Sequence, residues 1–195
     1  MLDEMARSDL ESFRRSQRLE VAPEITTNRL RLRAWRSEDL DPLVRMYTDE
    51  EIMRHLGGPQ TREEIEAFFP VRIERWRTQG WGAWAMELKE TPGIIGVLGY
   101  GPPKAPFEER EGFLDFGWLL DKDCWGKGFA TEAAQAALTW GFEDRHIVCV
   151  LATPDASNQG SRHVCEKLNM RPITTVDPIV VYSIDHHQWI AQPRG

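Results

Sequence analysis

Long hydrophobic segments, a disulfide framework and an excess of positive charge are all missing from this sequence. No apolar run approaches the ~18 residues that span a bilayer, and the first twenty residues lack the apolar core of a secretory signal. The cysteines, Cys124, Cys149 and Cys165, lie far apart and are odd in number, which suits a reducing compartment better than paired disulfides. We therefore expect a cytoplasmic protein with no membrane partner.

Basic residues are outnumbered, with 24 lysines and arginines against 31 aspartates and glutamates and a formal net charge of -7. Nucleic-acid-binding domains need a basic surface, so no nucleic-acid partner is expected. The motifs Cys-x-x-Cys and Gly-x-Ser-x-Gly are absent, and so are histidines four residues apart on a helix. These absences argue against a serine hydrolase, and we predict no metal site.

The chain otherwise has an ordinary globular composition. Its 195 residues are 41% hydrophobic and 28% charged, which fits one domain. Residues 1–22 are predicted to form a charged helical extension and residues 23–192 the domain itself. Within the domain, the hydrophobic pattern predicts a strand, two helices, three strands, a helix, a strand, a helix and two final strands. This order predicts an α/β domain with a mixed, mostly antiparallel sheet.

Capping and turn residues predict several boundaries. Ser37 is expected to cap the first helix, and Thr61 with Glu64 forms a capping box for the second. A turn at residues 91–93 should join the second and third strands. The later elements are expected at residues 113–120 (strand), about 127–142 (helix), 147–153 (strand), 158–169 (helix), and 173–176 and 179–185 (strands).

The segment "DKDCWGKGFATEAA", residues 121–134, places glycines between a strand and the start of a helix. The first backbone N–H groups of a helix have no partner inside it, and they bind phosphate well. Gly126 and Gly128 would let a pyrophosphate approach the backbone, and Lys127 could add positive charge. A plain strand-to-helix turn explains the glycines equally well. The Walker A spacing is absent, and Thr131 stands where a dinucleotide-binding motif needs its third glycine.

A second group of polar residues begins a later helix, in "TPDASNQGSRHVCEKLNM". Asn158 is a good N-cap, and Ser161 and Cys165 follow at one-turn spacing, so the three share one stripe of the helix. Asn158 could be a cap and nothing more. Cys165 could be a small core residue, because free cysteine is often buried.

Together these segments resemble the GNAT acetyltransferase superfamily, and within it the RimJ/RimL-like group of ribosomal-protein N-terminal acetyltransferases. The resemblance runs in order from about residue 25 to residue 190. It rests on the segments "TNRLRLRAWRSEDL", "DFGWLLDKDCWGKGFATEA", "NQGSRHVCEKLNM" and "VVYSIDHHQW". The superfamily signature Gln/Arg-x-x-Gly-x-Gly/Ala maps onto Trp125, Gly128 and Ala130. Trp125 departs from the superfamily form but suits the RimJ/RimL-like group.

The resemblance implies the GNAT fold, with helices on both faces of the sheet, and acetyl-CoA as co-substrate. It implies that backbone amides of the glycine turn bind the pyrophosphate, that the strand before the turn pairs with the pantetheine arm, and that Asn158 hydrogen-bonds this arm. The cofactor-binding residues implied in this way are Trp118, Leu119, Leu120, Gly126, Lys127, Gly128, Phe129, Ala130, Thr131, Asn158 and Ser161.

The implied reaction is direct attack of an amine on the acetyl thioester. A backbone N–H near Leu119 or Leu120, freed by a bulge in the strand, is expected to stabilise the oxyanion.

Candidate proton-transfer residues depart from the related enzymes. Rim-type enzymes use a glutamate base and a tyrosine acid at the positions where this chain has Thr153 and Cys165. Asp115 is therefore the candidate base, acting through water. Ser161 is favoured over Cys165 as the group that supports departure of coenzyme A, because the RimJ/RimL-like group carries serine there and a hydroxyl is the better donor.

We therefore expect an acetyl-CoA-dependent N-acetyltransferase that acts on a primary amine, such as a protein or peptide N-terminal α-amine. Two alternatives stay open. One is an acetyltransferase of small amines such as polyamines or antibiotics, and the other is a non-catalytic acyl-CoA-binding or regulatory domain. The helices of residues 38–80 and the loop of residues 102–112 should form the acceptor pocket, in a monomer or a homodimer.

Overall fold

The computed structural model describes residues 22–103, 107, 113–145 and 147–191. The predicted extension of residues 1–22 lies outside these ranges except for Ala22, which is buried in the main core. Most of the loop of residues 102–112 also lies outside the described residues. Within the described ranges, no helix has both the length and the apolar character needed to cross a membrane.

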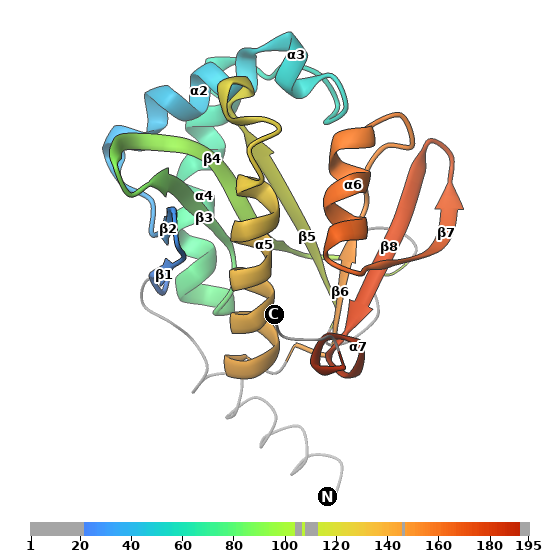
Figure 1. Cartoon of the computed structure of the whole chain (residues 1–195). Coiled ribbons are helices and arrows are strands. Elements are labelled where there is room, and N and C mark those ends of the chain that lie inside the picture. The colour runs from blue at the N-terminus through green and yellow to red at the C-terminus, as the bar shows by residue number, and fades with distance from the viewer. Residues whose placement is uncertain (1–21, 104–106, 108–112, 146, 192–195) are drawn as a thin grey trace, which may run out of the picture.

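One eight-stranded sheet organises the described chain (Figure 1). Its order is β1-β2-β3-β4-β5-β6-β8-β7, and each neighbouring pair is antiparallel except β5 with β6. The strands are β1 (Ile25–Thr26), β2 (Leu30–Arg33), β3 (Ala83–Leu88), β4 (Thr91–Gly101), β5 (Phe113–Leu120), β6 (Cys149–Ala152), β7 (Arg171–Val176) and β8 (Ile179–Asp185). The predicted α/β fold with a mixed, mostly antiparallel sheet is confirmed.

Helices connect these strands. The α-helices are α2 (Leu40–Thr48), α3 (Glu50–Met53), α4 (Arg62–Gln79), α5 (Phe129–Thr139), α6 (Gln159–Lys167) and α7 (His186–Ile190). Two 3-10 turns, η1 (Ser37–Asp39) and η2 (Lys122–Cys124), and a π-helical segment, η3 (Trp140–Asp144), complete the chain.

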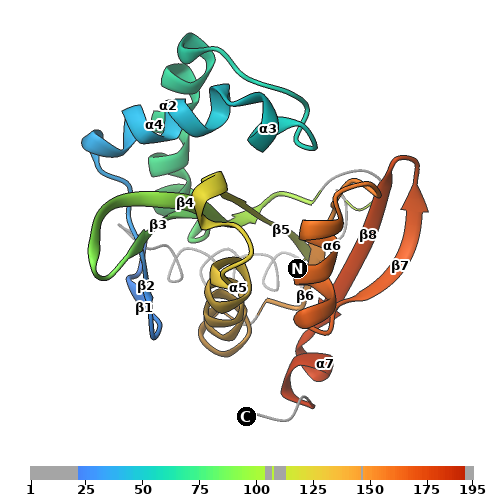
Figure 2. The ribbon, with the colours of Figure 1, turned by 45° about the horizontal axis from the view of Figure 1, so that its top comes forward.

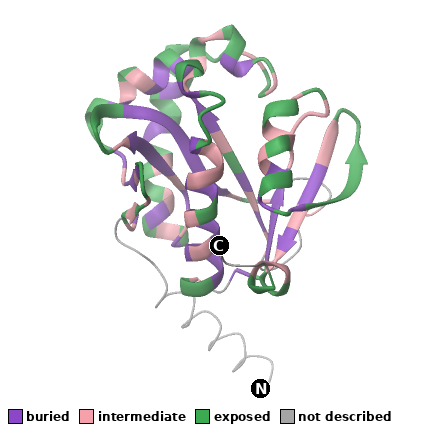
Figure 3. Ribbon diagram, in the orientation of Figure 1, coloured by how far each residue is buried: buried purple, intermediate pink, exposed green. Residues whose placement is uncertain are grey.

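Helices cover both faces of the sheet, with α2 and α4 on one side and α5 on the other (Figure 2). Successive side chains of β5 point to opposite faces of the sheet, so this strand contributes to the core on both faces. Leu114 and Phe116 pack into the core cluster that contains Ala134 of α5, whereas Leu119 packs into the cluster that contains Leu43 of α2 and Phe69 of α4. Figure 3 shows the buried residues concentrated along the strands and on the helix sides that face them.

The sheet opens between its two parallel strands. β5 pairs with β6 only over Phe113–Asp115, opposite Cys149–Leu151, whereas it pairs with β4 as far as Leu120. Beyond Asp115, the β6 side of β5 therefore carries no strand in the described part of the chain. Helices α5 and α6 stand on either side of this opening (Figure 1). The opening positions the candidate site.

Capping residues set two helix starts in different ways. Thr61 and Glu64 form the predicted reciprocal capping box of α4. At the first helical segment, however, the Asp39 carboxylate accepts a hydrogen bond from the Arg36 N–H at 2.8 Å. The prediction that Ser37 caps this segment was therefore wrong, because the buried carboxylate reaches back to the backbone in its place.

Other boundaries also differ from the prediction. β3 and β4 are joined at residues 89–90, because residues 91–93 already belong to β4. α5 begins at Phe129 and not at the predicted residue 127, because Gly128 has a left-handed backbone conformation that cannot be part of a right-handed helix. The short elements β1, α3 and α7 were not predicted, because two to five residues carry too little periodicity.

Candidate active site

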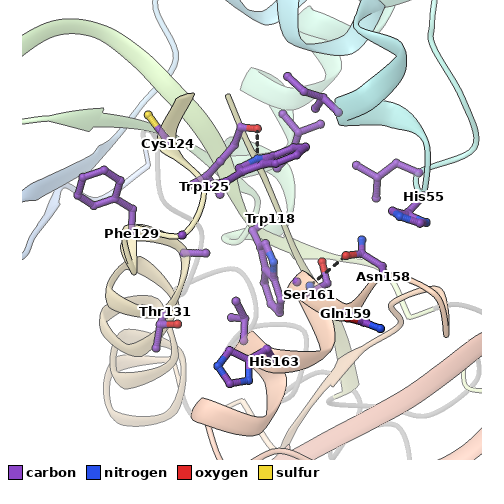
Figure 4. Close-up of a pocket in the computed structure, with 18 of the residues that line it drawn as sticks. His55, Trp118, Cys124, Trp125, Phe129, Thr131, Asn158, Gln159, Ser161 and His163 are labelled. Atoms are coloured by element: carbon purple, nitrogen blue, oxygen red, sulfur yellow. Dashed lines mark hydrogen bonds between the residues drawn. The ribbon is translucent and has the colours of Figure 1, made fainter. Parts of the chain in front are cut away.

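A cavity of about 510 Å³ lies at the opening of the sheet. Its walls come from α3 with the turn after it, the end of β5, the glycine turn with the first residues of α5, and one side of α6. Trp118 stands between the starts of α5 and α6 (Figure 4). Of the eleven cofactor-binding residues that the resemblance implies, all but Lys127 line this one cavity.

The glycine turn has the backbone shape of an anion site. Gly126 and Gly128 have φ angles of 71° and 80°, left-handed values that residues with side chains rarely adopt. The Glu132 N–H donates to the Gly128 carbonyl at 3.0 Å, so the N–H groups of residues 129–131 have no partner within the helix. A Cβ atom at Gly126 would meet nothing within 4 Å, which leaves the turn open.

Thr27 and Arg29, in the loop between β1 and β2, form hydrogen bonds that hold this turn. Glu132 accepts hydrogen bonds from the Thr27 hydroxyl at 2.6 Å, the Arg29 N–H at 2.8 Å and Arg29 Nε at 2.7 Å. Arg29 also donates to the Lys127 carbonyl at 3.0 Å and lies 4.5 Å over the Phe129 ring. These contacts therefore fix the orientation of the first turn of α5. The Lys127 residue is exposed and does not line the cavity.

The end of β5 presents backbone groups to the cavity. The Asp121 N–H donates to the Ile95 carbonyl at 2.9 Å, which marks a hydrogen-bonded pair of the β4–β5 ladder. Such pairs alternate along a ladder whose register is unbroken. Leu119 therefore bonds to β4, whereas Trp118 and Leu120 direct their N–H and C=O groups to the open side. The predicted bulge was wrong, because the divergence of β6 leaves these groups free to face the cavity without one.

Trp125 covers one of these outward groups. Its indole Nε1 donates to the Leu120 carbonyl at 3.0 Å, and the contact is drawn in Figure 4. Trp125 is 44% exposed and lines the cavity. The Leu120 N–H and both backbone groups of Trp118 are left facing the cavity.

Ser161 and Cys165 have different surroundings although they share a helix. Asn158 caps α6 by accepting a hydrogen bond from the Ser161 N–H at 3.0 Å, and both residues line the cavity. Cys165 is fully buried in the main core and is not part of the cavity wall. Burial raises the pKa of the Cys165 thiol to about 12, which makes it a poor proton donor. This placement favours Ser161.

Asp115 lies on the other face of β5. Its neighbours Leu114 and Phe116 point into the core beneath α5, so the alternation of the strand turns Asp115 away from it. The Thr153 hydroxyl donates to Asp115 Oδ1 at 3.3 Å, which links the candidate base to the residue that stands where Rim-type enzymes have a glutamate. The structure does not bring Asp115 into the cavity that Ser161 lines.

Helix α3 and the turn after it are held on both sides of the cavity. Toward α5, Lys122 Nζ donates to Asp49 Oδ2 at 2.9 Å. Toward α6, the Ser157 hydroxyl oxygen lies 3.2 Å from His55 Nδ1, and Ser157 also hydrogen-bonds the Asp155 carboxylate. His55 lines the cavity. Sequence reasoning missed this cluster, because its partners lie 102 residues apart and belong to no motif.

The polar groups of this cavity include outward-facing backbone N–H groups, the Ser161 hydroxyl and the His55 imidazole, and the charged residues Glu51, Arg54 and Lys167 also line it. Among the residues that the structure describes, no three His, Cys, Asp or Glu side chains are grouped as a metal site would require. The cysteines are all free and buried.

A family comparison agrees with this geometry. The model of the acetyltransferase (GNAT) domain family matches residues 29–171, which is most of the chain. The chain belongs to this family. It is therefore a GNAT acetyltransferase, and this part of the resemblance is confirmed. The match runs from β2 to the start of β7, so it includes the glycine turn, the opened edge of β5 and α6.

Individual relatives of this GNAT enzyme are distant. It is 28% identical over 163 residues to the uncharacterized protein YkkB of Bacillus subtilis, covering 81% of this chain and 93% of that protein. It is 26% identical over 151 residues to p20 of Bacillus licheniformis, named as an uncharacterized N-acetyltransferase, covering 74% and 80%. A solved structure of aminoglycoside acetyltransferase AAC(6')-Ib with coenzyme A superposes with a TM-score of 0.67. At 18% identity, covering 83% and 97% of the two chains, it shows a shared fold alone.

Proposed function

We propose that this GNAT acetyltransferase transfers the acetyl group of acetyl-CoA to a primary amine by direct attack in a ternary complex. We further propose that the acceptor is the N-terminal α-amine of a peptide or protein, as in the RimJ/RimL-like group. The observation that carries the proposal is one cavity that joins a helix start to an open strand edge. The helix start suits a pyrophosphate. The open strand edge suits an extended arm that contains amides.

In this proposal the cofactor binds mainly through backbone groups. The pyrophosphate lies against the amides of residues 126–131. The pantetheine arm runs along β5 in place of a strand and exchanges hydrogen bonds with Trp118 and Leu120. The Asn158 side-chain oxygen caps α6, so its amide NH₂ is the group that donates to the arm. The solved structure of AAC(6')-Ib, which has the same fold, contains coenzyme A, and this supports a coenzyme A thioester as the ligand.

The acetyl transfer needs a donor for the oxyanion and a proton for the thiolate. The amine nitrogen attacks the thioester carbonyl carbon, and the carbonyl electron pair moves onto oxygen. An outward N–H of Trp118 or Leu120 hydrogen-bonds this oxyanion. When the carbonyl re-forms, the C–S bond breaks and the thiolate leaves with its electron pair. Ser161 passes its hydroxyl proton to the thiolate and takes one from water.

An α-amine fits this site better than a lysine side chain. An α-ammonium group has a pKa of about 7.7–8.0 and a lysine ammonium about 10.4, so neutralising lysine requires over ~3 kcal/mol more at neutral pH. The described cavity wall contains no carboxylate in hydrogen-bonding contact with Ser161 or Asn158. A site without a strong base should select the amine that loses its proton more easily.

Peptides of one sequence test the acceptor. One has a free N-terminus and a blocked lysine, another has a blocked N-terminus and a free lysine, and a third has both blocked. Release of the coenzyme A thiol is the readout, and we expect turnover of the first peptide alone. Turnover that follows the lysine would contradict an α-amine acceptor.

Polyamines and aminoglycosides complete the same assay. Turnover of these and not of the peptides would assign the enzyme to small amines. Acetyl-CoA binding with no turnover of any acceptor would indicate a non-catalytic acyl-CoA-binding domain, and would overturn the proposal.

A further inference from the structure

We propose that His55 is the base that takes the proton from the acceptor amine, and that Ser157 and Asp155 hold its ring in the tautomer that this step needs. The proposal deepens the proposed function and rests on it. It comes from a cluster that belongs to none of the sequence motifs described above: a histidine from the turn after α3 bonded to the loop before α6, at the wall of the cavity.

Hydrogen-bond donors decide the tautomer. The Asp155 carboxylate accepts from both the Ser157 backbone N–H, at 2.8 Å, and the Ser157 hydroxyl. These bonds, together with the nearby His55, hold the pKa of the Asp155 carboxyl below its ordinary value, so Asp155 is an acceptor alone. The Ser157 proton is thus committed to Asp155. Ser157 Oγ must then accept from His55, which places the ring proton on Nδ1.

A neutral ring with its proton on Nδ1 carries its lone pair on Nε2. No hydrogen bond to Nε2 is found among the described residues, whereas Nδ1 is 3.2 Å from Ser157 Oγ. The His55 side chain is only 21% exposed and lines the cavity beside Asn158, as Figure 4 shows. The basic nitrogen is therefore the one available to a molecule in the cavity. An imidazole held by a second hydrogen-bonding group is the usual arrangement of a general base.

The charged groups around His55 come from several elements. Glu51 and Arg54 line the cavity from α3 and the same turn, and His163 and Lys167 line it from α6. Asp155 lies closest, with its Oδ1 4.0 Å from His55 Nδ1.

The proton balance is simple. His55 Nε2 takes one proton from the acceptor ammonium, which leaves a neutral amine to attack the thioester. The second proton of the attacking nitrogen passes to water as the amide forms, and the coenzyme A thiolate gains one proton from Ser161, which takes one back from water. The imidazolium returns its proton to solvent. Imidazole is a weaker base than a lysine amine by several powers of ten, so this base suits the α-amine acceptor.

If the contact between His55 and Ser157 were purely structural, replacing His55 would have different effects from those of losing a general base. The His55–Ser157 bond would then serve only to hold the turn after α3 against the loop before α6, and any donor at the Nδ1 position would suffice. His55→Asn separates the two roles, because its amide NH₂ occupies the place of Nδ1 while Nε2 is removed. His187→Asn is the matched control, because His187 is exposed on α7 and does not line the cavity.

The test is steady-state kinetics over a range of pH with the best peptide acceptor, with folding checked by thermal melts. We expect His55→Asn to melt at the wild-type temperature and to keep its KM for acetyl-CoA within about twofold of the wild-type value. Its kcat should fall roughly 100-fold or more. The fall in wild-type kcat at acid pH should be absent from this variant. Ser157→Ala should show a smaller loss of kcat, and His187→Asn should match the wild type.

Two outcomes distinguish the claims. If the wild type turns over peptide and His55→Asn keeps at least half its kcat with the same pH profile, the assignment of His55 is overturned and the proposed function stands. If the wild type turns over no acceptor, both fall together. Nitrogen NMR of histidine-labelled protein adds a readout independent of activity. It should show the Nδ1–H tautomer for His55 in the wild type, and its loss in Ser157→Ala, whereas the opposite tautomer in the wild type would overturn the proposal.

Discussion

Ser161 and Cys165 stand one turn apart on α6, and replacing each should change a different property. Ser161→Ala is expected to lower kcat by roughly ten- to a hundredfold with little change in acetyl-CoA affinity, because the Asn158 cap uses the backbone N–H of Ser161 and not its hydroxyl. Cys165→Ala removes a fully buried sulfur and should cost about 1 kcal/mol of stability while sparing kcat.

Kinetics and thermal melts of both variants check this pair. A folded but inactive Cys165→Ala beside a nearly wild-type Ser161→Ala would reverse the two roles. Full activity in both would mean that solvent alone protonates the thiolate.

Arg33 is a buried cation held by two carboxylates. Its Nη1 and Nη2 bond Asp39 at 2.7 and 2.8 Å, and its Nε bonds Glu87 at 2.7 Å. Arg33→Met leaves the buried Asp39 carboxylate without its ion pair and removes one of the two arginines that contact Glu87, so we expect the free energy of unfolding to fall by roughly 3–5 kcal/mol. Arg31→Met is the matched control, because Arg31 contacts the same Glu87 carboxylate at 3.2 Å but from a side chain that is 40% exposed, so its loss should stay below ~1 kcal/mol. Urea unfolding that shows equal losses would contradict this account.

Glu132 makes stability depend on pH. Partial burial by itself raises the pKa of the Glu132 carboxyl, but the hydrogen bonds from Thr27 and Arg29 outweigh it and lower that pKa. A carboxyl with a lowered pKa stabilises the fold above its unfolded pKa, and this contribution is lost as the pH falls through the folded value. Glu132→Gln should therefore be less stable than the wild type at pH 7, with the difference shrinking between about pH 5 and pH 3. A difference that stays constant over this range would rule out the carboxylate as its source.

The role of some single residues could be predicted from the neighbouring sequence, and the role of others could not. Gly126 and Asn158 could be predicted, because a glycine turn and an N-cap are local patterns whose geometry follows from the next few residues. His55 could not, because its partners come from a loop 102 residues away. Asp115 was correctly placed on a strand next to the site, and the alternation of β5 sets its face, but the sequence does not reveal that the cavity excludes it.

At the scale of elements, the glycine turn joins β5 to α5 through a backbone conformation that a side chain would strain. Gly128 has a φ of 80°. Gly128→Ala should lower stability by about 1–2 kcal/mol as well as weaken acetyl-CoA binding, and Gly128→Asn should lose less stability, because asparagine tolerates this conformation better. Gly101→Ala is the control, since a Cβ there meets nothing within 4 Å and the φ is not left-handed. Melting curves in which the two alanine variants coincide would show that residue 128 carries no strain.

Element boundaries were predictable where a local cap or a strong alternation defines them. β5 spans residues 113–120 as its pattern predicts, and α4 begins at its capping box. The predicted bulge in β5 failed for a non-local reason. What faces the cavity depends on where β6 leaves β5, which is after Asp115, and no local pattern in β5 marks that point.

At the scale of the whole molecule, the order of strands and helices was enough to predict the fold class, because short connections favour antiparallel neighbours and the helix before β6 favours one parallel pair. The order cannot predict that α3 and its following turn are tied to both sides of the cavity. That arrangement depends on Asp49 meeting Lys122 and His55 meeting Ser157, contacts between segments brought together only by the complete fold.

The central claim is that acetyl-CoA occupies the cavity formed by the glycine turn and the open edge of β5. Thermal unfolding with increasing acetyl-CoA tests it most directly, because a ligand that binds only the folded state stabilises it by about 2.7 kcal/mol at ~100 times its dissociation constant. For a chain of this length, that corresponds to a rise in Tm of roughly 5–10 °C. The account predicts such a rise in the wild type and a smaller one in Gly128→Ala at the same concentration. An unchanged Tm at millimolar acetyl-CoA would contradict it.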